Sequence, residues 1–83
     1  MAGRKEIAMR SIDLHGLVLH DAWKKFNIFV FDCYISKPKT TVKVITGQGA
    51  MMKEFPHWAS ANTYIKSYKQ AEFNPGAWVL KLK

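Results

Sequence analysis

The chain has few cysteines, prolines and acidic residues: one Cys, three Pro and six Asp or Glu among 83 residues. A single thiol cannot form an internal disulfide, and Cys33 lies in an apolar stretch, so we assign it to packing and expect a cytoplasmic protein. No apolar run approaches the roughly twenty residues that span a bilayer. Residues 1–10 lack the apolar stretch of a signal peptide, and we therefore expect no membrane partner.

The shortage of acidic residues leaves the chain basic. Thirteen Lys and Arg give a net charge of +7. This balance favours a polyanionic partner, which such proteins bind through phosphate contacts and counterion release. A solvated basic surface that serves solubility explains the charge equally well. Charge alone therefore leaves both interpretations open.

The length allows one domain with a small core. Residues 1–10 are polar and carry Arg4, Lys5 and Arg10, which predicts a flexible basic N-terminal arm. Residues 11–83 are expected to form the single domain.

Apolar periodicity divides this domain into strands and helices. Period-two alternation and β-branched residues predict strands, and apolar residues three and four positions apart predict helices. The expected elements are strands at 11–15, 40–45, 64–68 and 77–82, helices at 20–35 and 50–61, the second interrupted or kinked at Pro56, and a turn at 74–76. This β-α-β-α-β-β order predicts an α/β domain, a two-layer α+β sandwich whose mixed four-stranded sheet is packed by two helices. The first two strands are expected to run parallel.

The first expected helix carries a second apolar line that the sheet does not need. Ile28, Phe31 and Ile35 follow one another at helical spacing, away from the face predicted to pack on the sheet. We hypothesise that they form a homodimer contact. Covering by the N-terminal arm and simple exposure are the alternatives.

Two short motifs carry the polar residues of greatest interest: Asp13-Leu14-His15-Gly16 and Thr46-Gly47-Gln48-Gly49. Each follows a predicted strand. Parallel strands deliver their carboxyl ends to one edge of the sheet, where open α/β sheets bind ligands. The motifs are therefore expected to meet in space.

Each motif has a chemical and a structural interpretation. A carboxylate at Asp13 can hold the tautomer of His15 and make it a general acid or base, or the pair can ligate a metal. Alternatively, Asp13 caps a turn and His15 bonds to backbone. Gly47 and Gly49, ahead of a helix, can bring backbone amides to a phosphate, but they also suit an ordinary strand-to-helix turn.

Together these motifs resemble the small MutS-related (Smr) domain family. Ile12 to Gly16 and Val44 to Gly49 match the family's two motifs, and the resemblance extends over nearly the whole chain through Asp21-Ala22, Trp58 and Gly76-Ala77-Trp78-Val79-Leu80. It implies a fold similar to the C-terminal domain of a bacterial translation initiation factor, and binding and often cleavage of DNA or RNA. The chain departs from the family at Gln48, where a basic residue is frequent. It departs again at Asn74-Pro75-Gly76, where the family has a fuller glycine cluster.

The resulting hypothesis is an endonuclease in which His15 transfers a proton and Asp13 orients it. Water or a ribose hydroxyl is the expected nucleophile, since neither motif holds a Ser or Cys. The expected phosphate-binding residues are Gly16, Lys43, Thr46, Gly47, Gln48, Gly49 and Lys53. Asp13 and Glu54 are candidate ligands of a divalent cation such as Mg²⁺.

Two other functions stay open at this point. One is a nucleic-acid-binding module without catalysis, in which the loop holds phosphates and Trp58 or Tyr68 stacks on bases. The other is a protein-interaction adaptor that uses the line of Ile28, Phe31 and Ile35.

Overall fold

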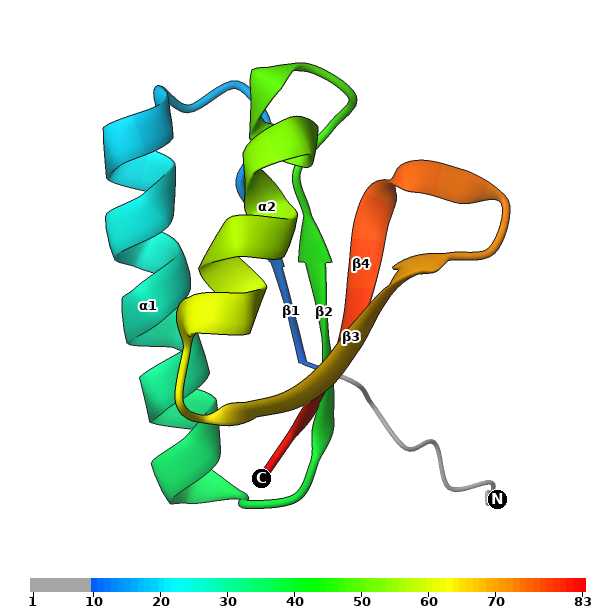
Figure 1. The fold of residues 1–83 in the computed structure, drawn as a ribbon. Helices are drawn as coiled ribbons and strands as arrows, with labels where there is room; N and C mark the ends of the chain where they lie inside the picture. The colour runs from blue at the N-terminus through cyan, green and yellow to red at the C-terminus, as the bar shows by residue number, and fades with distance from the viewer. Residues whose placement is uncertain (1–9) are drawn as a thin grey trace, which may run out of the picture.

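Two helices cover one face of a four-stranded sheet in the computed structural model, which describes residues 10–83 (Figure 1). The elements follow the predicted order: β1 Ser11–Asp13, α1 Leu19–Ser36, β2 Thr41–Ile45, α2 Ala50–Ala61, β3 Ile65–Ala71 and β4 Asn74–Leu82. The predicted two-layer α+β architecture is thereby confirmed.

The sheet is mixed, with strand order β1-β2-β4-β3. β1 runs parallel to β2, with Ser11 opposite Lys43 and Asp13 opposite Ile45. β4 pairs antiparallel with both β2 and β3. The parallel β1–β2 pair confirms that the segments after these two strands leave the sheet at the same edge.

The core lies between the helices and one face of the sheet. Val42 and Val44 of β2 and Leu80 and Leu82 of β4 are buried, and the residues between them are not. Successive strand residues point to opposite faces, so these four side chains share the face that the helices cover. Aromatic rings join the two helices to this face: Phe26 to Phe55, Phe26 to Trp58 and Phe55 to Trp78.

Three expectations about the elements need correction. The turn between the last two strands lies at Glu72 and Phe73, because Asn74-Pro75-Gly76 already belongs to β4. β1 ends at Asp13, so His15 lies in the following loop. α2 runs uninterrupted through Pro56.

Arg10, which we expected in the N-terminal arm, is part of the folded domain. Its guanidinium donates to Asp32 at 2.9 Å and lies 5.8 Å from the ring centre of Phe29. Its carbonyl accepts the amide of Lys43. The other residues of the expected arm, 1–9, lie outside the described residues.

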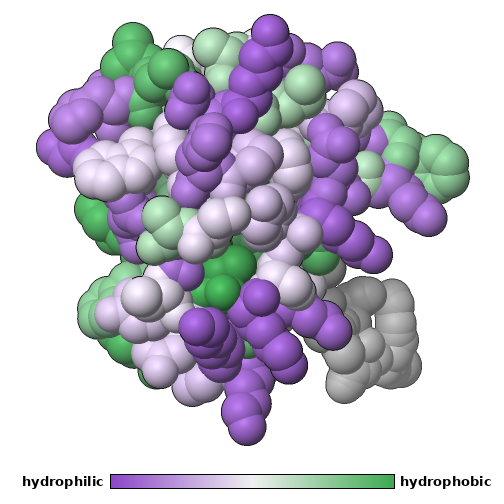
Figure 2. All heavy atoms as spheres, in the orientation of Figure 1, coloured by the Kyte–Doolittle hydropathy of each residue, from purple (hydrophilic) through white to green (hydrophobic). Residues whose placement is uncertain are grey.

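The outer face of α1 is apolar. Ile28, Phe31 and Ile35 are 68%, 45% and 58% exposed, and Phe31 packs partly on the ring of Tyr64. Apolar surface is visible along the margin that α1 occupies in Figure 2. Self-association through these residues stays a prediction, which sedimentation at high concentration tests. Neither of the helices described within residues 10–83 has the length and hydropathy of a membrane span.

Candidate functional site

The loops after β1 and β2 line one cleft of about 600 Å³ at the carboxyl end of these strands. Its walls are residues 15–19 and 46–51, so both predicted motifs contribute to it. The first residues of α1 and α2, Leu19 and Ala50, also border it. The predicted convergence of the two motifs is therefore present in the structure.

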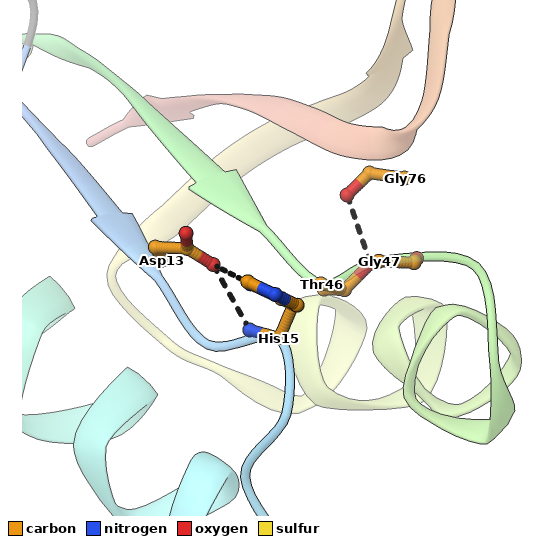
Figure 3. Close-up of polar contacts among 5 residues, drawn as sticks. All are labelled: Asp13, His15, Thr46, Gly47 and Gly76. Atoms are coloured by element: carbon orange, nitrogen blue, oxygen red, sulfur yellow. Dashed lines mark hydrogen bonds and ion pairs between the residues drawn. The ribbon is translucent and has the colours of Figure 1, made fainter.

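Asp13 and His15 form a hydrogen-bonded pair at the rim of this cleft (Figure 3). The Asp13 carboxylate lies 2.8 Å from Nδ1 of the His15 ring and also accepts the His15 backbone amide at 3.0 Å. The side chains are 54% and 67% exposed, respectively. The bonds from the ring and the amide of His15 lower the pKa of Asp13 below its ordinary value, so this carboxyl is ionised at neutral pH.

One carboxylate oxygen of Asp13 caps the turn, as the structural interpretation expects, and also contacts the His15 ring, as the chemical interpretation requires. The carboxylate accepts at Nδ1, which places the proton of the neutral ring there and leaves Nε2 with a free lone pair. Nε2 can therefore take a proton from a bound group.

The core fixes this pair through Leu14, the residue between them. Leu14 is fully buried, and its amide donates to the carbonyl of Ile45 at 2.7 Å. Gly16 then reverses the chain with a φ of +85°, a conformation that side-chain-bearing residues rarely adopt. The pair is thus held by an anchored residue on one side and a glycine turn on the other.

The second motif is locked to the start of β4. The carbonyl of Gly76 accepts the amides of Thr46 at 2.7 Å and Gly47 at 3.0 Å. The hydroxyl of Thr46 lies 2.9 Å from the carbonyl oxygen of Gly47 and 3.2 Å from that of Gly76, and it accepts the indole N–H of Trp78 at 3.2 Å. Thr46 is buried and its hydroxyl is engaged inside the fold.

These bonds change which amides are available to a phosphate. The amide of Gly47, which we expected to bind phosphate, is used by Gly76. In the described part of the chain, the amides of residues 48–51 have no acceptor. Those of Ala50 and Met51 open α2, whose N-cap Gly49 provides no side-chain cap and whose first turn has no acidic residue. An anion would therefore meet the amides from Gln48 onward, at the N-terminus of α2.

Of the four remaining candidate site residues, one lines the cleft and three do not. Gln48 is exposed within the loop that lines it. Lys43 lies in the middle of β2, and Lys53 and Glu54 are exposed on α2; none of the three belongs to the lining.

Gly76 is the site residue that sequence reasoning underrated. A Cβ at this position would lie 2.9 Å from the carbonyl carbon of Gly47, so only glycine lets β4 approach the loop this closely. The Gly-Ala pair before an apolar strand was the available signal, but it did not reveal that the glycine carbonyl holds the loop.

Fold and site together define a small two-layer α+β domain with a polar pair and a glycine loop at one strand edge. The family model of the Smr domain matches residues 12–82, and the chain belongs to this family. The family is associated with nucleic-acid binding and endonuclease activity.

Solved structures agree with this assignment. The Smr domain of Thermus thermophilus MutS2 superposes with a TM-score of 0.83 at 16% identity, over 90% of this chain and 99% of that one. The SMR domain of NEDD4-binding protein 2 has a TM-score of 0.67 at 17% identity, over 99% of this chain and 94% of that one. At these identities the likeness shows the fold. A comparison with curated proteins gives no match.

Proposed function

We propose that this protein is an endonuclease that cleaves phosphodiester bonds of DNA or RNA at the cleft. The observation that carries the proposal is the 2.8 Å contact between Asp13 and Nδ1 of His15, which leaves Nε2 free in a residue that lines the same cleft as the unused amides of residues 48–51. Family membership supports the same assignment.

In this mechanism the scissile phosphate lies against the amides that follow Gly47. These donors and the N-terminus of α2 stabilise the charge that develops on the phosphoryl oxygens. Nε2 of His15 removes the proton of an attacking water or ribose hydroxyl, whose oxygen forms a bond to phosphorus. The bond to the leaving oxygen breaks, and that oxygen is protonated by the imidazolium or by water. Asp13 is the positioning residue: it holds the tautomer and stabilises the cation formed on His15.

The described residues do not fit a dedicated metal site. Within residues 10–83, no three His, Cys, Asp or Glu side chains gather at one point, and Glu54 lies on α2 outside the cleft lining. His15, Asp13 and the amides that follow Gly47 are therefore the groups that carry the proposed steps.

The test is cleavage of end-labelled single- and double-stranded DNA and RNA, with and without a chelator. His15→Ala should lower the cleavage rate by about 10²- to 10⁴-fold, the usual contribution of a positioned acid or base. His57→Ala is the matched control, since His57 is an exposed histidine on α2 outside the cleft. A His15 variant that cleaves as fast as the wild type would refute the mechanism.

The second candidate function is a nucleic-acid-binding module without catalysis. It is supported by the exposure of the Asp13–His15 pair, which leaves the reacting position open to solvent. Trp58 and Tyr68 do not support base stacking in this module: Trp58 packs on Phe26 and Phe55, and Tyr68 packs on Trp78. Tight binding by the wild type without cleavage of any of the four substrates would favour the module.

A further inference from the structure

The charges of the described fold are divided unevenly between its two layers. The helices hold three lysines and three acids, Lys24, Lys25, Lys53, Asp21, Asp32 and Glu54, and are neutral together. Strands β2, β3 and β4 carry four lysines and no acid, namely Lys43, Lys66, Lys69 and Lys81. With Asp13 of β1 counted, the sheet carries a net charge of +3, whereas the two helices carry none.

Strand register places three of these lysines on the face turned away from the helices. Lys43 lies between the buried Val42 and Val44, and Lys81 lies between the buried Leu80 and Leu82. Since neighbouring strand residues alternate in direction, both lysines point away from the core.

Lys69 points the same way. Its neighbour Tyr68 lies on the helix side, because its hydroxyl is 3.2 Å from that of Ser60 on α2 and its ring packs on Trp78. Lys69 and Lys43 are both opposite Val79 of the central strand β4, one on each side. We call Lys43, Lys69 and Lys81 the lysine face.

The lysine face is uncovered and unneutralised within the described fold. Both helices lie on the opposite side of the sheet (Figure 1). The ion pairs among residues 10–83 are Arg10 with Asp32 and Asp13 with His15, so no acid of this part of the chain pairs with these lysines. At the sheet end opposite the cleft, four lysines line a further hollow of about 560 Å³, namely Lys39, Lys66, Lys81 and Lys83.

The Asp13 side chain lies on this same side of the sheet, and His15, to which it is hydrogen-bonded, lines the cleft. Asp13 follows Ser11 by two residues, and Ser11 pairs with Lys43. Residues two apart on a strand share a face, so the Asp13 side chain emerges on the side of Lys43, about 7 Å further along. A nucleic acid strand bound by these lysines can therefore continue into the cleft.

We propose that the lysine face is the docking surface for the phosphate backbone of the nucleic acid whose cleavage was proposed above. The proposal rests on that function and extends it, since it assigns binding to strands outside both motifs. Charge complementarity identifies the occupant: three clustered lysines fit a polyanion, since Asp13, the acid on this side of the sheet, is paired with His15 and not with a lysine, and the adjoining cleft presents amides to a phosphate. The lysines hold the backbone without reading its sequence.

The test compares two double variants that remove the same charge. Lys69→Gln/Lys81→Gln removes two lysines of the lysine face, and Lys24→Gln/Lys25→Gln removes two from α1; all four are exposed, so the fold tolerates the changes. Fluorescence anisotropy measures the affinity for labelled single-stranded RNA, single-stranded DNA and duplex DNA over a salt series.

The sheet variant should bind at least about tenfold more weakly at 0.1 M salt. Its plot of log affinity against log salt should be shallower by about 1.4 for a single strand or about 1.8 for a duplex, the loss of two phosphate contacts. The α1 variant should keep the wild-type slope. Equal behaviour of the two variants would overturn the proposal.

Cleavage measured in parallel separates this proposal from the proposed function. The sheet variant should raise KM and keep kcat at saturating substrate, whereas His15→Ala should lose kcat and keep the affinity. A wild type that binds through the lysine face without cleaving would overturn the endonuclease alone. A wild type that binds no nucleic acid, or binds polyglutamate equally well at equal charge, would overturn the docking proposal.

Discussion

Replacing Gly76 by alanine should displace the loop at Thr46 and Gly47, although Gly76 lies 30 residues after Thr46 in the sequence. A Cβ at this position would lie 2.9 Å from the carbonyl carbon of Gly47, 3.0 Å from its Cα and 3.1 Å from its oxygen. All three atoms are backbone, so the contact is relieved only if β4 and the loop move apart. That movement lengthens the bonds from the Thr46 and Gly47 amides to the Gly76 carbonyl, now 2.7 and 3.0 Å.

The magnitude follows from these two effects. Forcing a methyl group into a packed contact costs about 1–3 kcal/mol, and weakening buried hydrogen bonds adds roughly 1 kcal/mol. A total of about 2–4 kcal/mol is a large part of the 5–15 kcal/mol that stabilises a typical domain. Urea unfolding followed by tryptophan fluorescence measures the loss, and the cleavage assay should show a fall in kcat for protein that remains folded.

The neighbouring glycines provide the controls. Gly49→Ala should cost less than about 1 kcal/mol, because a Cβ there meets nothing within 4 Å and its φ of −97° lies outside the left-handed region. Gly16→Ala also has free space but a φ of +85°, so only backbone strain of about 1–2 kcal/mol is expected. If Gly76→Ala were as stable as Gly49→Ala, the close approach of β4 to the loop would be wrong.

Three further changes test other parts of the structure. Phe55→Ala should cost about 3–5 kcal/mol in urea unfolding, since the ring is fully buried between Phe26 and Trp78; a loss below 2 kcal/mol would contradict this packing. Phe73→Asn should stabilise the domain by about 0.5–1 kcal/mol, because Phe73 is 99% exposed at a φ of +64° that asparagine adopts more readily; an unchanged or lower thermal midpoint would argue against this turn. Asp13→Asn should remove a pH dependence of stability. Because the bond to His15 lowers the pKa of Asp13, the ionised carboxylate stabilises the fold above the ordinary pKa near 3.9, and this stabilisation is lost as pH falls through the lowered pKa. The wild type and the variant should therefore converge in stability in acid, and parallel pH profiles would refute the bond to His15.

Much of the fold is readable from the sequence because it depends on local patterns. The spacing of the apolar residues predicted the buried side of α1: Ala22, Phe26, Phe29, Val30 and Cys33. Four of them are fully buried and Phe29 is partly buried. The order of elements then fixed the parallel β1–β2 pair, since a helix joins these strands. That parallel pair was sufficient to bring the two motifs together.

The parts that the sequence did not reveal depend on contacts between distant segments. Asn74-Pro75-Gly76 has stronger turn chemistry than Glu72-Phe73, so local propensity predicted the wrong turn. The bonds from Thr46 and Gly47 to Gly76 hold this segment in β4 instead. The same bonds use the Gly47 amide, which no reading of the loop alone could show.

The exposure of the Asp13–His15 pair bears on why it exists. Solvent screens an ion pair at the surface, so this contact contributes little to folding in comparison with the buried aromatic cluster. Three features nevertheless fix its geometry: the buried Leu14 between the two residues, the glycine turn at Gly16, and the close packing of His15 on Gly47. This packing is so close that a Cβ on Gly47 would lie 3.2 Å from the Cβ of His15. A bound nucleic acid strand would exclude water from the pair and strengthen the hold of the carboxylate on the imidazole. A contact that adds little to folding when exposed and strengthens when covered has the properties that the proposed binding and proton transfer require.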